Sequence, residues 1–181
     1  MAIDIGHHIG YRWQGMKQCC WLTSIEMLMQ HKYGSIYGRN SRHSNYALEK
    51  KRENNGSHVM LHQDQYNLAG NTSLRKNTTI GDWENALRKG PVLAEGNFGM
   101  NSIGLYKHVV VIIGVSRTKK LVYFNPNLFS VFPHAQTNLS YISVERCIKL
   151  AKGSGDGPFW QVREDIGLLD EKWFDASDSV P

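Results

Sequence analysis

The segment that most constrains the fold is 108–115, HVVVIIGV, which is apolar and β-branched almost throughout. Val and Ile favour extended backbone, and a strand that is apolar at nearly every position must be covered on both of its faces. The segment therefore predicts a central strand with layers above and below it. Turn formers at 117–120 and a second apolar segment at 121–124 predict an antiparallel partner joined to it as a hairpin.

Two polar residues frame this predicted hairpin at one end. His108 begins the first strand, and Asn125, which Pro126 follows, comes directly after the second strand. Because a hairpin places the start of one strand beside the end of the other, the two side chains are expected to be neighbours. An Asn beside a His can fix the orientation of the imidazole ring, as catalysis by a general base requires.

A second chemistry-bearing segment lies near the N-terminus, where Cys19 and Cys20 precede a helical pattern. Apolar residues recur at helical spacing over 21–33, and Gly34 supplies a stop. The thiols therefore sit at or just before a helix N-terminus, where unpaired N–H groups and the helix dipole favour an ionised sulfur. Gln14, six positions before Cys20, offers a carboxamide donor of the kind that holds an oxyanion.

Caps, stops and alternation predict the other elements. They are a helix capped by Thr79 and ended by Gly90, a strand over 91–96, a helix from Ser143 to Gly153, and a strand over 158–162. Trp83, Leu87 and Cys147 are expected in the core. The segment 46–53 is predicted to be helical. A loop with short elements is predicted at 59–74, and irregular structure is predicted at 130–139.

Composition narrows the class of protein. A chain of 181 residues with 41% hydrophobic content suits one globular domain over 1–181. Neither a membrane-spanning apolar run nor a basic region followed by an apolar signal segment is present, so neither a membrane span nor a secretory signal peptide is predicted. Three cysteines argue against a disulfide framework, and they predict synthesis in a reducing cytoplasm.

Charge is unevenly distributed along the chain. The C-terminal tail, about 164–181, holds six acidic residues and one lysine, so a net charge of +5 leaves about +10 on the remainder. A basic body suits acidic protein surfaces, nucleic acid or an anionic cell wall. His7 and His8 lack a cluster of Cys, Asp or Glu at ligand spacing, so no metal site is predicted there.

Taken together, the motifs resemble those of papain-like cysteine proteases. The resemblance frames residues 14–126. It rests on Gln14-Gly15 before Cys20-Trp21, on Gly90-Pro91 before a strand, on Lys107-His108 before a Val/Ile strand, and on Asn125-Pro126 after the next strand. Met29 and Tyr33-Gly34 are more similar to two bacterial branches, the bacteriocin-leader-processing peptidases and injected effector proteases. Those branches usually show Asp-Pro where this chain has Asn125-Pro126, whereas papain has Asn.

The resemblance implies a fold and a reaction. The fold would be α+β and papain-like, with an N-terminal helical part carrying Cys20 and an antiparallel β-sheet carrying His108 and Asn125. The reaction would be hydrolysis of a protein amide through an acyl-enzyme. Cys20 would be the nucleophile, His108 the base and acid, Asn125 the residue that orients it, and Gln14 an oxyanion-hole donor. Neither a metal nor an organic cofactor is called for.

The resemblance also implies a setting. Such a protein would be made in the bacterial cytoplasm without a signal peptide and delivered by a secretion system into a target cell. Its substrate would be a protein there, and an immunity or inhibitor protein would cover its active site. The same triad serves deamidation or cross-linking of glutamine, and peptidoglycan amide cleavage, so these stay open. A nucleic-acid-binding module using the basic cluster at 39–52 ranks lower, because that cluster lacks an aromatic stacking pattern.

Overall fold

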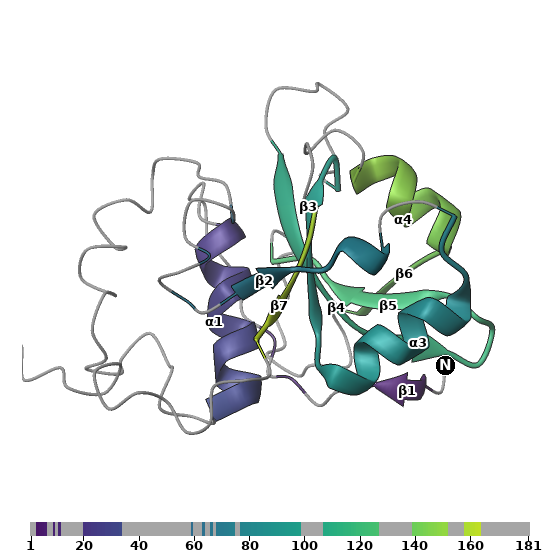
Figure 1. The fold of residues 1–181 in the computed structure, drawn as a ribbon, viewed down its shortest axis with the longest axis horizontal. Coiled ribbons are helices and arrows are strands. Elements are labelled where there is room, and N and C mark those ends of the chain that lie inside the picture. Colours follow the sequence, from purple (N-terminus) through teal and green to yellow (C-terminus); the bar gives the residue numbers. More distant parts are fainter. Residues whose placement is uncertain are drawn as a thin grey trace, which may run out of the picture.

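The fold is known from a computed structural model. It describes residues 3–6, 9, 11, 20–33, 59, 63, 66, 68–74, 77–98, 107–126, 139–151 and 158–163. Several sequence predictions lie outside these residues: Gln14, Cys19, the stops at Gly34 and Gly153, the helix at 46–53, the basic cluster at 39–52 and the tail at 164–181. The described part is a mixed α/β structure, in which helices lie on both sides of an antiparallel sheet (Figure 1).

Six strands run in the order β2-β7-β3-β4-β5-β6, and a seventh, β1, pairs with β4. Every one of these pairings is antiparallel. The strands are β1 (Ile3–Gly6), β2 (Leu68–Gly70), β3 (Val92–Gly96), β4 (His108–Ser116), β5 (Leu121–Phe124), β6 (Leu139–Ile142) and β7 (Phe159–Val162).

Strand β4 is the centre of the sheet, as its β-branched sequence predicts. All nine of its residues are buried. Its first half pairs with β3, so that His108 lies opposite Gly96, and its second half pairs with β1. On its other side it pairs with β5, with a shift of register between Ile112 and Gly114. The predicted hairpin of β4 and β5 is therefore confirmed.

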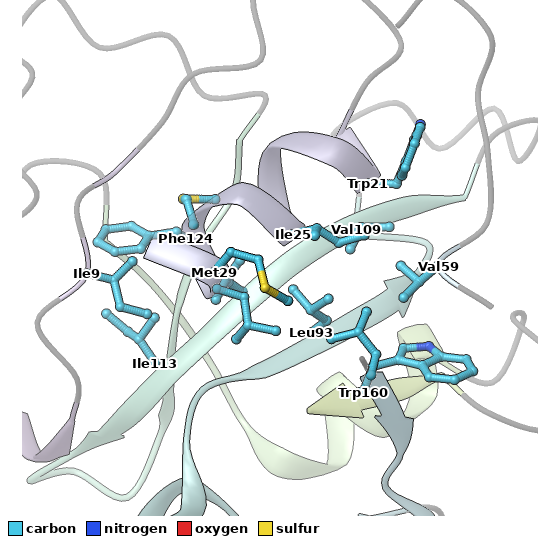
Figure 2. Close-up of a cluster of buried hydrophobic side chains, with 14 of the residues drawn as sticks. Ile9, Trp21, Ile25, Met29, Val59, Leu93, Val109, Ile113, Phe124 and Trp160 are labelled. Carbon is cyan, nitrogen blue, oxygen red and sulfur yellow. The ribbon is translucent and has the colours of Figure 1, made fainter. Parts of the chain in front are cut away.

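Helix α1 (Cys20–Tyr33) covers one face of this sheet. Its buried side chains include Trp21, Leu22, Ile25, Leu28 and Met29, and they share a core with apolar side chains of β3, β4, β5 and β7. Figure 2 shows Ile25 beside Val109 and Met29 farther along the helix, toward the Ile113 end of β4. The predicted helix is confirmed, and Cys20 is its first residue.

Helices α3 (Ile80–Lys89) and α4 (Val144–Ala151) lie on the opposite side of the sheet (Figure 1). Both predicted N-caps are confirmed: Thr79 forms a capping box with Asp82, and the Ser143 hydroxyl accepts the Arg146 N–H at 3.3 Å. Such caps satisfy N–H groups that have no partner within the helix. The core residues predicted in these helices, Trp83, Leu87 and Cys147, are all fully buried.

Two short strands, β1 and β6, differ from the sequence predictions, whereas β2 is a short element of the kind predicted for its region. Residues 3–6 form β1, in a segment that the sequence does not predict as a strand, and β2 falls within a stretch predicted to be loop with short elements. The segment 130–139 is predicted to be irregular, yet Leu139 begins β6. Each of these strands has only three or four residues. So short a segment shows little periodicity, and its pairing with a distant strand decides its conformation.

Among the described residues, no helix combines the length and the apolar character that crossing a membrane demands.

Candidate active site

The centre of the candidate site is a buried pair formed by His108 and Asn125. His108 Nε2 lies 2.6 Å from Asn125 Oδ1, and the two residues are 7% and 4% exposed. An amide oxygen only accepts hydrogen bonds, so Nε2 must carry the proton and donate it. The lone pair of the neutral ring is then on Nδ1. The pair therefore holds the imidazole in the tautomer that leaves Nδ1 free to accept a proton.

The hairpin explains why these two residues meet. Val111 of β4 pairs with Phe124 of β5, so Asn125 follows directly on the strand that runs beside the start of β4. Pro126 disfavours a helical conformation at the residue before it. Asn125 is the first residue past β5, and from there its amide reaches the ring of His108.

Burial sets the protonation of this histidine. Desolvation lowers the pKa of His108 below its usual 6.5, and the hydrogen bond to Asn125 raises the pKa in part. The burial contribution is the larger of the two, because a charged imidazolium loses its hydration when it is enclosed. The neutral ring, which can act as a base, is thus the favoured form at neutral pH.

Helix α1 is bonded to the start of β4 one turn after Cys20. The Ser24 hydroxyl, one helical turn after Cys20, donates a hydrogen bond to the backbone oxygen of Val109 at 3.0 Å. Val109 directly follows His108, so this bond ties the first turn of α1 to the start of β4. Residues four apart on a helix lie on the same face. Cys20, which is half-buried, is the first residue of α1 and lies on the same helix face as Ser24.

Strand β3 pairs with the His108 end of β4, and the end of α4 packs against β3 there. Gly96 lies opposite His108, and a Cβ atom there would overlap the Leu150 oxygen and lie 2.8 Å from the Ala151 Cα. The Asn97 N–H donates to the same Leu150 oxygen at 3.0 Å. Only glycine permits so close an approach of the helix end. The strand that carries His108 is thus supported by packed backbone.

Two described residues near the site are absent from the sequence predictions. Tyr11 donates its hydroxyl to the backbone oxygen of Asn125 at 3.0 Å. Glu95, 3% exposed, pairs in register with Val109 and accepts the Val59 N–H at 3.3 Å. A single tyrosine in a loop carries no sequence signal. A glutamate within an otherwise apolar strand is the signal that could have found Glu95, because an acid in a buried strand requires partners.

The remaining candidates are distinguished by burial. Cys147 is fully buried in α4, and this burial raises the pKa of its thiol to about 12. Such a thiol stays protonated and inaccessible, which agrees with its predicted place in the core.

Cys19 and Gln14 lie outside the described residues. Within the described residues, no group of three or more His, Cys, Asp or Glu is arranged to hold a metal ion.

Comparisons with protein-family models, with curated proteins and with solved structures give no significant match for this chain.

Proposed function

We propose that this chain is a papain-like cysteine protease that hydrolyses protein amide bonds through Cys20, His108 and Asn125. The observation that carries the proposal is the buried hydrogen bond of 2.6 Å between His108 and Asn125. It lies at the sheet end where the Ser24 bond to Val109 fixes the helix that begins at Cys20. Acyl transfer of this kind requires a nucleophile, a base and a group that orients the base, the roles proposed here for Cys20, His108 and Asn125.

The first half of the reaction forms the acyl-enzyme. The Nδ1 lone pair of His108 takes the proton from the Cys20 thiol, and the sulfur attacks the carbonyl carbon of the substrate amide. The backbone N–H of Cys20 and the side chain of Gln14 stabilise the resulting oxyanion. Each such donor is worth roughly 3 kcal/mol in the transition state. The imidazolium then gives its proton to the leaving nitrogen, and the C–N bond breaks.

The second half releases the acid. His108, neutral again, takes a proton from water, and the hydroxide attacks the thioester. The tetrahedral intermediate collapses, the C–S bond breaks, and the proton returns from His108 to the sulfur. Asn125 accepts the Nε2–H of the ring throughout, so Nδ1 stays aimed at the reacting atoms. The position of Cys20 at the start of α1 lowers the cost of negative charge on its sulfur.

The biological setting belongs to the same proposal. The chain acts as a bacterial effector or toxin on proteins of a target cell, and a separate immunity protein of the producing cell covers Cys20 and His108. The basic character of the chain outside its acidic tail favours an acidic surface on that immunity protein. An enzyme with a reactive thiol would otherwise damage the proteins of the cell that makes it.

The test compares wild type with Cys20→Ala in cells. New protein termini in the wild-type proteome that Cys20→Ala abolishes would support a protease. The control variant is Cys147→Ala, which removes a buried thiol and should preserve cleavage. A gain of about one dalton at glutamine without new termini would instead reveal a deamidase. Equal proteomes for wild type and Cys20→Ala, with both proteins folded, would refute a thiol hydrolase acting on proteins.

A further inference from the structure

Tyr11 contacts the candidate site from outside the hairpin. Its hydroxyl donates to the backbone oxygen of Asn125 at 3.0 Å, although 114 residues separate the two in sequence. Its ring packs on Phe124, with centroids 5.5 Å apart and planes inclined by 56°. One half-buried side chain thus contacts two consecutive residues at the end of β5. Burial raises the pKa of Tyr11 to about 12, so the phenol stays a hydrogen-bond donor at neutral pH.

These contacts restrain the residue that orients the histidine. The side chain of Asn125 accepts from His108, and its backbone oxygen accepts from Tyr11. Asn125 lies past the end of β5, so the sheet ladder of β5 ends at the residue before it. The Tyr11 hydroxyl therefore holds the Asn125 backbone just beyond the β5 ladder. Without this bond, the backbone that carries the Asn125 amide would have more freedom to move relative to the ring.

We infer that Tyr11 is a positioning residue, which holds Asn125 so that His108 keeps its productive tautomer and orientation. This inference rests on the proposed function for its effect on turnover. Its effect on the imidazole is independent of that function. The substitution Tyr11→Phe removes the hydroxyl and keeps the ring against Phe124, so it isolates the hydrogen bond.

The first readout is the His108 Nε2 proton, followed by NMR of the protein with 15N-labelled histidine. In wild type the proton bonded to Asn125 should be shielded from exchange with water. In Tyr11→Phe we expect its exchange to accelerate by about tenfold, the factor that loss of one ordinary hydrogen bond produces. The backbone amide resonance of His108, the first residue of β4, appears in the same spectra and reports that the variant is folded.

The matched control is Tyr123→Phe. Tyr123 lies on the same strand as Phe124, and its ring packs against Phe98 with centroids 6.4 Å apart. Its substitution removes a half-buried phenol of the same hairpin without touching the bond to Asn125. We expect Nε2–H exchange in this control to match wild type. Equal exchange in Tyr11→Phe and wild type would overturn the inference whether or not the chain proves to be a protease.

The second readout is turnover of a cleaved substrate. Tyr11→Phe should lower kcat about tenfold and leave KM unchanged, because the hydroxyl acts on the base rather than on the substrate. In an Asn125→Ala background the same substitution should have almost no further effect, since the residue through which it acts is gone. A tenfold loss that persists in that background would overturn the role of Asn125 as the link.

Discussion

His108 Nε2 and Asn125 Oδ1 lie 2.6 Å apart across a hairpin, at residues 17 apart in sequence. Both residues are buried, so the bond is shielded from competition with water. Removing one partner of such a bond costs more than the bond itself contributes, because the other partner stays buried and unpaired. The pair is therefore sensitive to removal of either partner.

Substitutions at Asn125 should separate orientation from charge. Asn125→Asp keeps an oxygen acceptor for Nε2–H and should retain much of the activity. Asn125→Ala leaves a buried donor without an acceptor, and kcat/KM should fall about 10- to 100-fold. The measurement is kcat/KM on a substrate that the wild-type enzyme cleaves. Full activity in both variants would remove Asn125 from the site.

The pH dependence of the same variants has a definite sign. The bond to Asn125 raises the pKa of His108, so Asn125→Ala should lower this pKa further. Asn125→Asp adds a negative charge beside the ring and should raise it. The acid limb of kcat/KM should move to lower pH in the first variant and to higher pH in the second. If the acid limbs of the two variants moved in the same direction, His108 could not be the titrating group.

Thiol labelling should identify the nucleophile. Iodoacetamide at neutral pH should alkylate Cys20 fastest, because Cys20 is half-buried at a helix N-terminus. Cys147 should react only after unfolding, since it is fully buried and burial raises its pKa to about 12. Peptide mapping against time distinguishes the three cysteines, with denatured protein as the control. Preferential labelling of Cys19 in folded protein, with Cys20→Ala still active, would reassign the nucleophile.

The sequence predicts local parts of this site well and distant parts poorly. His108 and Asn125 could be paired in advance because a single turn joins their strands. The start of α1 could be predicted because apolar spacing defines the helix. The bond from Ser24 to Val109 spans 85 residues, and the bond from Tyr11 to Asn125 spans 114. No local pattern encodes such contacts, since the chain path between the elements creates them.

Strand order shows the same limit. The strand at 158–162 is predicted and is confirmed as β7, but its place between β2 and β3 is not encoded in its own sequence. Leu93 pairs with Trp160 on one side of β3 and with Val111 on the other. The apolar residues of 158–162 do not by themselves specify the position between β2 and β3. Packing of the assembled core selects the strand that occupies it.

Stability should fall with acid through His108. The folded-state pKa of His108 is lowered by burial, so between that value and the unfolded value of 6.5 the unfolded chain binds more protons. The free energy of unfolding should then decrease as pH drops below about 6.5 and level off below the folded-state pKa. His108→Gln should lose this part of the slope. Urea unfolding from pH 8 to pH 4 measures both proteins, and identical slopes would refute the prediction.

Two glycine substitutions should have opposite effects on stability. A Cβ at Gly96 would meet backbone atoms of Leu150 and Ala151, which cannot rotate away, so α4 would have to move. We expect Gly96→Ala to lower the free energy of unfolding by about 1–3 kcal/mol. It should also reduce activity, because Gly96 lies opposite His108 in the sheet.

Gly81→Ala is the matched control. Gly81 lies in α3, and a Cβ there would come no nearer than 3.6 Å to the Thr79 hydroxyl, which is an ordinary contact. Alanine loses less backbone freedom than glycine on entering a helix, so the substitution should stabilise the protein by up to about 1 kcal/mol. Activity should be unchanged, because α3 lies across the sheet from α1 (Figure 1). Urea unfolding measures both variants. If Gly96→Ala proved as stable and as active as Gly81→Ala, the end of α4 could not be closed against β3, and the support inferred for His108 would be wrong.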